Sequence, residues 1–255
     1  MKETAAVRPY YSQKGASTAF YDLVTAADHS LVGDVELYAG LSPEGGSILE
    51  LGAGTGRVAL ALAAKGYRVT GLDISQPMLD QAKAKRATLP NAIAERVKFV
   101  RADMTTFDLG RTFDTVICTF YALAHLPVGP AWSKVFAATA RHLKPGGVAA
   151  FHLPVPSKMR GSPPPPNQPV LLSATPAGES LALYVVSQTM DDDLGKMDLV
   201  LRYAVSGSKG VKETLERLTL YAGDPEPFAA ACGLRPYRDP VPLGDDGFVH
   251  TFRLG

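Results

Sequence analysis

A chain of 255 residues, of which 46% are hydrophobic and 20% charged, has the composition of a globular protein with enough apolar side chains for one large core. The 26 basic and 25 acidic residues nearly cancel, which argues against nucleic acid as a general partner. Two cysteines are too few for a disulfide framework, and no run of about 18 apolar residues indicates a membrane span. The N-terminus also has no apolar leader. We therefore expect a cytoplasmic protein that binds neither nucleic acid nor membrane.

The N-terminal part of the chain predicts a helical cap over residues 1–42. Residues 1–15 are polar and aromatic, and we expect them to be irregular unless they close over a ligand. Residues 16–41 carry two apolar stripes at helical spacing, which predict two helices on either side of Asp28-His29-Ser30. The next five residues, Ser42–Gly46, have a composition typical of a loop.

Apolar strands and amphipathic helices then alternate over residues 43–153. The predicted strands are Ser47–Leu51, Tyr67–Leu72, Val97–Arg101, Phe113–Phe120 and Val148–Leu153. The predicted helices are Val58–Lys65, Gln76–Ala87 with Ser75 as its N-cap, and a stripe from Trp132 to Leu143 that is ended by the following Lys-Pro-Gly-Gly. This alternation predicts an α/β fold with a parallel, doubly wound sheet, in which a ligand binds beyond the carboxyl ends of the strands.

The alternation ends after Leu153. Residues 154–178 contain SPPPPNQP and predict a surface loop with polyproline II character. The β-rich segments that follow, around a turn at Asp191–Gly195, are Leu181–Gln188, Met197–Val205 and Thr214–Tyr221. We expect residues 154–221 to form a β-rich lid, an added sheet over the site and not a separate domain. Residues 222–255 complete the core sheet in this prediction, with a short helix at Pro225–Cys232 and antiparallel strands at Leu234–Val241 and Phe248–Arg253.

A glycine turn follows the first strand of the alternating region. Glu50–Arg57 reads ELGAGTGR, with glycines at the alternate positions 52, 54 and 56 and a predicted helix directly after it. Glycine permits a positive φ and leaves no Cβ between the backbone and a ligand. The free N–H groups of a first helical turn favour an electron-rich ligand. A strand, a glycine turn and a helix N-terminus in this order predict a cradle for a nucleotide-like cofactor.

Four segments carry a resemblance to a known family; in chain order they read ELGAGTGR, GLDIS, RADM and LKPGG. They are similar to the class I S-adenosylmethionine (SAM) dependent methyltransferases of the small-molecule type, with a domain resembling methyltransferase domain 25. The resemblance covers residues 48–153 clearly and residues 225–253 more loosely. It implies a Rossmann-like, mostly parallel sheet of seven strands, with SAM as methyl donor and S-adenosylhomocysteine as product. A dinucleotide-binding oxidoreductase also has an acid about 20 residues after its first glycine, and Asp73 stands at a similar distance after Gly52. Its glycine turn, however, has the spacing G-x-G-x-x-G.

The resemblance implies a set of cofactor-binding residues. They are Tyr11, Tyr21, Glu50, Gly52, Ala53, Gly54, Thr55, Gly56, Arg57, Asp73, Ile74, Met78, Ala102, Asp103, Met104, Thr119 and Phe120. Asp73 would accept both ribose hydroxyls, Asp103 would accept the adenine amino group, and the Met104 backbone N–H would meet an adenine ring nitrogen. Glu50 would orient the glycine turn or the methionine amine, and a backbone carbonyl at Thr119–Phe120 would meet that amine.

Several of these residues have ordinary structural explanations as well. Ile74 and Met78 would flank the adenine, although Met78 is equally typical of a hydrophobic core. Arg57 would pair with the methionine carboxylate, or be an exposed helix residue. Tyr11 and Tyr21 would contact the methionine end or the sulfonium, because aromatic faces attract cations, or would pack the cap on the core.

Methyl transfer from SAM is an in-line displacement at carbon, for which a protein supplies orientation, a dry site and, where the nucleophile carries a proton, a base. His125 follows the strand Phe113–Phe120, where an acceptor would reach the methyl group, and is the first candidate for a catalytic base. Tyr121 is a comparable catalytic candidate and His152 is the second candidate for a base; packing or hydrogen bonding is the alternative role of these residues. The sequence has no acidic cluster of the catechol type, so we expect no metal.

The function predicted from these observations is methyl transfer to a nucleophilic nitrogen, oxygen or carbon of a small organic molecule. Nitrogen is slightly favoured by the resemblance alone. Two alternatives stay open: an RNA or protein methyltransferase, and a non-catalytic module that binds SAM or NAD. We expect a monomer or a homodimer. The acceptor itself is not encoded in a readable way, because the lid loops that would define it follow no general code.

Overall fold

The computed structural model describes residues 6–12 and 14–255. By its backbone contacts the chain divides into two compact units. The core unit consists of Ser30–Val155 and Ala222–Gly255, and the added unit consists of Pro156–Tyr221 with the described part of Met1–His29. The segment predicted as a cap, residues 1–42, is therefore divided between the units, and its first part groups with the segment predicted as a lid. The roles of cap and lid remain predictions.

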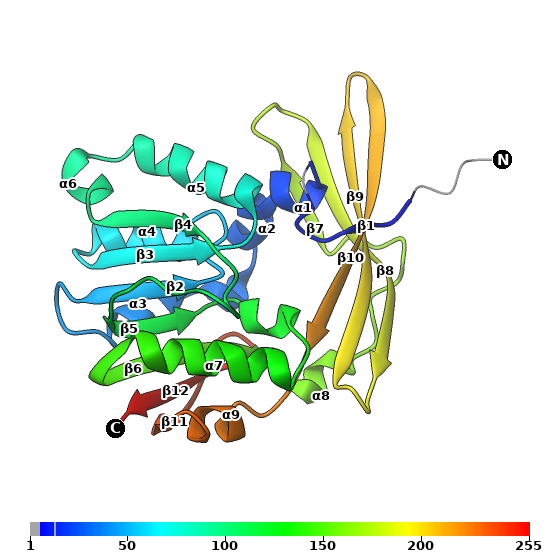
Figure 1. Cartoon of the computed structure of the whole chain (residues 1–255). Helices are drawn as coiled ribbons and strands as arrows, with labels where there is room; N and C mark the ends of the chain where they lie inside the picture. The colour runs from blue at the N-terminus through cyan, green and yellow to red at the C-terminus, as the bar shows by residue number, and fades with distance from the viewer. Residues whose placement is uncertain (1–5, 13) are drawn as a thin grey trace. The chain divides into compact units, whose positions relative to one another are not determined.

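The core unit is built on one mostly parallel sheet. Among the described residues this sheet has seven strands in the order β11-β12-β6-β5-β2-β3-β4, as Figure 1 shows. Their bounds are β2 Ser47–Leu51, β3 Arg68–Asp73, β4 Val97–Arg101, β5 Phe113–Cys118, β6 Leu143–Pro154, β11 Leu234–Pro242 and β12 Gly247–Leu254. The pairs from β6 to β4 are parallel, and β12 and β11 are added antiparallel. This arrangement confirms the predicted Rossmann-like α/β fold.

Helices cover both faces of this sheet. The described helices of the core unit are α3 Asp34–Ala39, α4 Arg57–Ala64, α5 Gln76–Ala87, α6 Asn91–Ala94, η2 Ala122–His125, α7 Pro130–His142 and α9 Glu226–Ala230, and η1 His29–Leu31 precedes α3. Successive residues of a strand point to opposite faces. Accordingly Ile48 of β2 packs with the cluster under α3 and α4, whereas Leu49 packs with the cluster under α7 and α9. None of the described helices combines the length and the apolar character that a membrane crossing requires.

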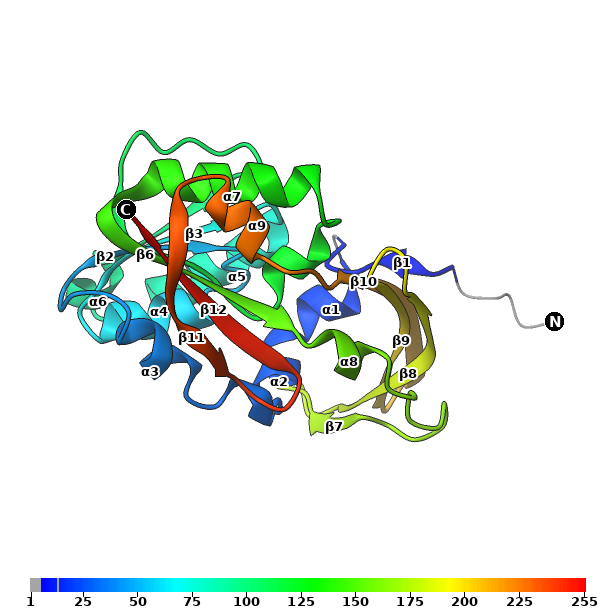
Figure 2. The ribbon, with the colours of Figure 1, turned by 90° about the horizontal axis from the view of Figure 1, so that it is seen from below.

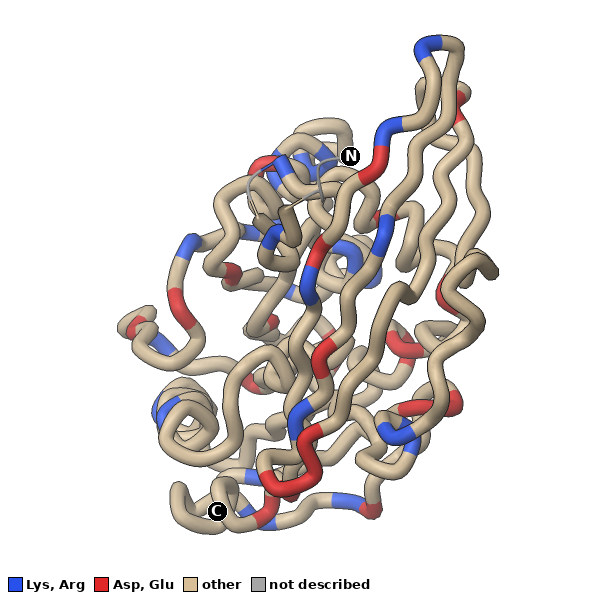
Figure 3. Tube along the Cα trace, turned by 90° about the vertical axis from the view of Figure 1, so that its right-hand side faces the viewer, with Lys and Arg blue, Asp and Glu red and all other residues tan. Residues whose placement is uncertain are grey.

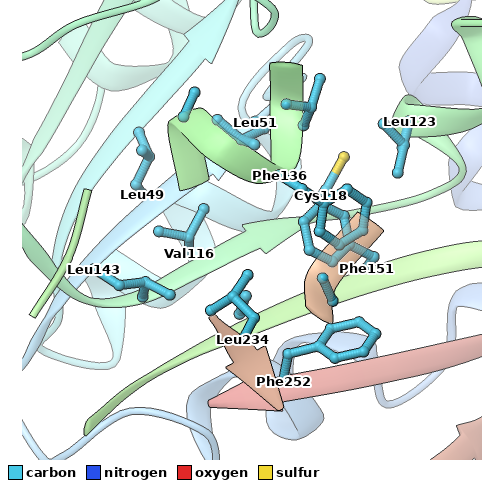
Figure 4. Packing of buried hydrophobic residues seen from close by; sticks show 14 of the residues in the cluster. Leu49, Leu51, Val116, Cys118, Leu123, Phe136, Leu143, Phe151, Leu234 and Phe252 are labelled. Atoms are coloured by element: carbon cyan, nitrogen blue, oxygen red, sulfur yellow. The ribbon is translucent and has the colours of Figure 1, made fainter. Parts of the chain in front are cut away.

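The cluster under α7 is held together by aromatic side chains from distant parts of the chain. Phe136 of α7 stacks on Phe151 of β6 with ring centroids 4.4 Å apart, and Phe252 of β12 meets both rings edge-on. Figure 4 shows these rings beside Leu234 and Val116, and Figure 2 shows β11 and β12 next to β6. The last strands thus contribute to the same cluster, and β12 pairs with β6 and β11 with β12 in the core sheet.

Over the residues that the structure describes, the added unit contains a five-stranded sheet in the order β1-β10-β9-β8-β7. Its elements are β1 Arg8–Pro9, β7 Leu171–Ala174, β8 Ser180–Asp191, β9 Lys196–Gly207, β10 Gly210–Tyr221, α1 Ala16–Ala19, α2 Tyr21–Ala26 and α8 Pro156–Met159. Leu181, Leu201 and Tyr203 of the sheet form an apolar cluster with Ala16, and Phe20 packs against it. The strands β8, β9 and β10 confirm the three predicted β-rich segments, each extended by a few residues.

Charged side chains on the strands of the added unit contact one another and an aromatic ring. Arg202 lies over the ring of Tyr184, with its guanidinium carbon 4.2 Å from the ring centroid, and its guanidinium is 3.5 Å from the Glu213 carboxylate. Lys196 pairs with Asp198 at 2.7 Å on the same strand. Figure 3 shows that basic and acidic residues are interspersed along these strands.

Several predicted element boundaries were wrong for identifiable reasons. Residues 8 and 9 are not irregular, because they pair in parallel with Glu216 and Arg217 of β10. The two helices predicted between residues 16 and 41 are four short ones, α1, α2, η1 and α3, interrupted by Phe20, Ala27 and the left-handed Gly33. Residues 154–178 are not wholly a loop, because β7 pairs antiparallel with β8 and α8 precedes it.

The ends of two core strands also differ from the prediction. The fifth predicted strand, β6, begins at Leu143, because Leu143 pairs with Phe113 and a register shift absorbs the residues up to Val148. The fourth, β5, ends at Cys118, because Phe120 and Tyr121 adopt left-handed φ values. Ser75 occupies the N-cap position of α5 as predicted, but its side chain makes no capping hydrogen bond.

Candidate functional site

The glycine turn between β2 and α4 requires its glycines. Gly52, Gly54 and Gly56 have φ values of 70°, 54° and 79°, a region that is strained for residues with a side chain. Space is also limiting: a Cβ on Gly52 would lie 2.6 Å from the Cβ of Ala122, and one on Gly56 would lie 2.7 Å from Cζ of Phe99. The turn that leads into α4 therefore has a conformation that residues with a side chain would not adopt. Ala53 and Thr55, the remaining residues of the turn, are both buried.

Asp73, at the end of β3, binds the glycine turn directly. Its Oδ2 accepts a hydrogen bond from the Gly54 N–H at 2.7 Å, and its Oδ1 accepts one from the Ser75 N–H at 2.7 Å. Burial raises the pKa of this carboxyl group, and the backbone hydrogen bonds partly offset that rise. A carboxylate has about four acceptor positions, so it retains capacity for further donors such as hydroxyls. The next residue, Ile74, is 63% exposed, which leaves an apolar surface beside the carboxylate.

Asp103 stands at the same edge of the sheet, just after β4. Its Oδ1 accepts hydrogen bonds from the backbone N–H and the hydroxyl of Thr105, at 2.8 and 2.7 Å. The N–H of Ala102 donates to the Asp73 carbonyl at 3.0 Å, which ties the end of β4 to the end of β3. Met104 reaches the glycine turn, because its methyl carbon would lie 3.5 Å from a Cβ on Gly52. The structure thus brings the predicted Ala102–Met104 segment to the turn.

Glu50, the last but one residue of β2, is the buried acid of the site. Its side chain is 1% exposed, and its Oε1 accepts a hydrogen bond from the Thr119 hydroxyl at 2.9 Å. Its Oε2 has no hydrogen-bond partner among the described residues. Burial raises the pKa of Glu50 to about 8, although the Thr119 hydroxyl and the nearby Arg57 act in the opposite direction. A buried acceptor without a partner is costly, and a cationic donor such as an ammonium group would satisfy it.

Arg57, the first residue of α4, is bound by a residue that the sequence analysis did not single out. Its guanidinium donates to both carboxylate oxygens of Asp34, which lies in α3 and is 2% exposed. No motif marks Asp34; only its acidic character within an apolar helical stripe was unusual. The guanidinium is thereby held near the glycine turn, and the pairing of Arg57 with a methionine carboxylate stays a prediction.

A strained turn after β5 carries the two predicted catalytic residues. Phe120 and Tyr121 have φ values of 43° and 60°, and η2 begins with the next residue. The Thr119 carbonyl accepts a hydrogen bond from the Ala122 N–H at 3.0 Å, which closes this turn. His125 ends η2 and is half-buried, and burial lowers its pKa to about 4, so that its imidazole is neutral at pH 7.

Of the remaining predicted site residues, one has a structural role in the core unit and two belong to the added unit. Met78 is 2% exposed and belongs to the buried face of α5, in agreement with its alternative role as a core residue. Tyr11 and Tyr21 belong to the added unit, where their rings contact each other with centroids 5.9 Å apart. Their contact with a cofactor stays a prediction. Among the described residues, no group of three or more His, Cys, Asp or Glu side chains is arranged to hold a metal ion.

The residues present fit a cofactor with adenosine and amino acid parts. Asp73 and Asp103 offer carboxylate acceptors at the ends of adjacent strands, and Glu50 offers a buried acceptor for a cation. This distribution of acceptors along β2, β3 and β4 matches a ligand whose ribose, adenine and ammonium groups are separated along its length. A dinucleotide would instead place its pyrophosphate at the turn and the N-terminus of the helix after it.

Comparisons with known proteins support this assignment. Residues 48–147 match the family model described as a methyltransferase domain. Over 112 residues the chain is 36% identical to a putative methyltransferase, YqeM, of Bacillus subtilis, which covers 43% of this chain and 42% of that protein. Over 117 residues it is 32% identical to a dTDP-4-amino-2,3,4,6-tetradeoxy-D-glucose N,N-dimethyltransferase of Saccharopolyspora spinosa, which covers 46% of this chain and 44% of that protein. The chain thus spans less than half the length of these two relatives.

The fold comparison extends over the whole chain. The CcbJ methyltransferase from Streptomyces caelestis superposes with a TM-score of 0.78 at 22% identity, covering 97% of this chain and 98% of that chain. SAM-bound CalS10, an amino pentose methyltransferase from Micromonospora echinaspora, superposes with a TM-score of 0.67 at 22% identity, covering 94% of this chain and 98% of that chain. At this identity the likeness shows the fold. Residues 48–147 match the methyltransferase domain, and the fold of the chain is similar to that of class I SAM-dependent methyltransferases.

Proposed function

We propose that the protein transfers a methyl group from SAM to an amine nitrogen of a small organic molecule, such as an amino sugar. The observation that carries the SAM part is the buried Glu50, whose Oε2 lacks a partner among the described residues beside the glycine turn. The amine is supported by relatives whose names specify amino-sugar N,N-dimethyltransferases. Nitrogen is therefore preferred over oxygen or carbon in this proposal.

The roles of the residues follow from their chemistry. Asp73 and Asp103 accept hydrogen bonds from the ribose hydroxyls and the adenine amino group, and Glu50 accepts from the ammonium group. When bound, SAM would supply an electrophilic methyl group: the acceptor nitrogen would form the N–C bond, sulfur would keep the electron pair of the broken S–C bond, and the methylated acceptor nitrogen would lose its proton to the solvent. Exclusion of bulk water and orientation of the nitrogen lone pair are the protein's main contributions to this step.

His125 fits an orienting role better than the role of a strong base. Because burial lowers its pKa to about 4, the imidazole is neutral at pH 7 and does not repel a sulfonium cation. The same low pKa makes it a weak proton acceptor. We therefore propose that His125 accepts a hydrogen bond from the acceptor amine, which attacks in its neutral form. In this role His125, the first candidate for a base in the sequence, orients the amine without taking up its proton completely.

The acceptor class can be tested with matched pairs of compounds. Purified protein and SAM are incubated with dTDP-3-amino-sugars and their 3-hydroxy counterparts, with the corresponding free amino sugars, and with peptide N-termini, and S-adenosylhomocysteine is quantified. We expect turnover with an amine and at least tenfold less with its hydroxyl counterpart. Turnover with the hydroxyl compounds alone would replace nitrogen by oxygen as the acceptor atom. Bound SAM without turnover of any amine would overturn the proposed function.

A further inference from the structure

Three neighbouring strands bring a tyrosine, a histidine and a glycine together beside the cofactor residues. Tyr121 follows β5, His152 lies near the carboxyl end of β6, and Gly247 begins β12 opposite Pro154. In the sheet order β12-β6-β5-β2-β3-β4 these residues occupy one half, and the carboxylates assigned to the cofactor occupy the other half. Both sets lie at the same edge of the sheet. The β5-β6-β12 half therefore carries polar side chains at the edge of the sheet where the residues assigned to the cofactor also lie.

The rings of Tyr121 and His152 are packed together in a strained setting. Their centroids are 4.4 Å apart with an interplanar angle of 44°. The imidazole of His152 is completely buried, and alternation along β6 directs it away from the apolar cluster that holds Phe151 and Leu153. The φ of Tyr121 is 60° and that of Phe120 is 43°, and such conformations persist where the surroundings enforce them. The turn thus fixes the direction of the tyrosine ring.

Gly247 supplies the space for both polar groups. Its φ lies outside the left-handed region, so the backbone alone does not require glycine. A Cβ at this position would lie 2.4 Å from Nε2 of His152 and 2.6 Å from the hydroxyl oxygen of Tyr121. Since both atoms approach the same point, they occupy the volume that a side chain would take. Elsewhere in the core unit, a Cβ on Gly40 would meet its nearest atoms at ordinary distances of 3.5 and 3.6 Å.

We propose that Tyr121 is a catalytic residue whose hydroxyl hydrogen-bonds the acceptor, and that His152 and Gly247 are positioning residues that hold this hydroxyl in place. The proposal rests on the proposed methylation of an amine. It assigns His152 an indirect role, in place of the role of a second base that its position in the sequence suggested. The hydroxyl orients the acceptor's lone pair toward the methyl group, and an aromatic ring held by a strand and a turn loses little freedom when it does so.

The test is a set of variants assayed with SAM and the amine that turns over fastest in the panel above. Tyr121→Phe removes only the hydroxyl and should lower kcat about 5- to 30-fold, the effect of one lost hydrogen bond. His152→Ala should lower kcat to the same extent, His152→Gln should restore most of it, and the double variant Y121F/H152A should be no slower than either single variant. SAM affinity, measured by calorimetry, should stay within twofold throughout. Gly247→Ala should reproduce the loss of kcat.

Two controls separate these effects from general damage. Gly40→Ala adds a methyl group where space is ordinary, and Tyr67→Phe removes a hydroxyl that donates to the Ala39 carbonyl at 2.9 Å. Both should retain the wild-type kcat. A multiplicative loss in Y121F/H152A, or a loss of SAM affinity parallel to the loss of kcat, would show that His152 does not act through Tyr121. If the wild-type protein binds SAM and methylates none of the amines, the proposed function fails and this proposal fails with it. If wild type is active and Y121F is unchanged, only this proposal fails.

Discussion

Glu50 is the residue whose structural environment gives the strongest support to the proposed chemistry. It is buried at the end of a central strand, one of its oxygens is held by Thr119, and the pKa is raised to about 8. An acid in this state is mostly protonated at pH 7 and becomes ionised when a cation binds beside it. Arg57 lies nearby but is bound by Asp34, so it does not supply a full counter-charge for Glu50.

The first prediction concerns proton release on cofactor binding. At pH 7 the binding of SAM should release about one proton per site, because the ammonium group favours the ionised form of Glu50. Calorimetry in buffers of different ionisation enthalpy, such as phosphate and Tris, measures this number directly. Glu50→Gln should abolish the release and weaken binding, whereas Glu36→Gln, at an exposed position, should change neither. Equal proton release by wild type and E50Q would contradict the role of Glu50.

The same group predicts how stability depends on pH without ligand. The pKa of Glu50 is higher in the folded than in the unfolded state, so between pH 4.5 and about 8 the folded state binds more protons. The contribution of this group to stability is therefore present below pH 4.5 and is lost as pH rises toward 8, at up to about 1.4 kcal/mol per pH unit. Urea unfolding at pH 5 and pH 8 should show E50Q gaining stability relative to wild type at the higher pH. A constant difference between the two proteins would contradict this.

At the scale of elements, the glycine turn and η2 depend on each other. Gly52 has a positive φ, and a Cβ there would overlap with Ala122, the first residue of the η2 helix that ends at His125. Gly52→Ala should therefore weaken SAM binding at least tenfold and lower the stability by about 1–3 kcal/mol, since both the backbone and η2 must shift. Calorimetry with SAM and thermal unfolding measure the two effects. Gly40→Ala is the matched control, and comparable losses in both variants would argue against a special constraint at the turn.

In the added unit, a buried carboxylate fixes the first helix. Glu216 of β10 is completely buried and accepts hydrogen bonds from the backbone N–H groups of Ala16 and Ser17 at the start of α1. Glu216→Ala leaves these donors without that acceptor and should cost about 1–3 kcal/mol, with faster amide exchange in α1. Glu216→Gln keeps an acceptor oxygen and should cost less.

The control for this prediction lies on the same strand. Glu213 is an exposed partner of Arg202, and Glu213→Ala should change stability by no more than about 1 kcal/mol. Hydrogen exchange monitored by mass spectrometry reports α1 separately from the core unit. Unchanged exchange in α1 of E216A would show that the carboxylate does not hold the helix.

Elements with strong local patterns were predictable from the sequence. The parallel strands are continuous apolar runs, so β2, β4 and α5 were located to within a residue. The glycines of the turn likewise indicate its positive φ values. Elements that depend on distant partners were not predictable. The short β1 exists only because residues some 200 positions later pair with it, and the start of β6 depends on a bulge against Phe113.

Site residues divide in the same way. Asp73 and Asp103 follow apolar strands, so their position at the sheet edge could be inferred from the pattern of strands and loops alone. The role of Asp34 could not be inferred from the sequence, because it consists in binding Arg57, which comes close to Asp34 only in the folded protein. The left-handed turn at Tyr121 could not be predicted either, because Phe120 and Tyr121 adopt positive φ values without being glycines.

For the molecule as a whole, the main difference between expectation and structure lies in how the chain divides into compact units. The sequence suggested an N-terminal cap and a later lid as separate additions to one core. The structure groups residues before position 30 with Pro156–Tyr221, through β1, the capped α1 and a shared apolar cluster. Such a unit is assembled from segments far apart in the chain, and no local sequence pattern in either segment predicts that it pairs with the other.

The central claim is that the edge of the core sheet binds SAM, and one calorimetric titration tests it most directly. Wild-type protein should bind SAM and S-adenosylhomocysteine with one site per chain and should not bind NAD. Asp73→Asn should weaken SAM binding at least tenfold, because Asp73 is held by the Gly54 N–H beside the turn, whereas Asp80→Asn on the exposed face of α5 should bind as wild type does. Binding of NAD in preference to SAM, or equal SAM affinity of wild type and D73N, would contradict the account.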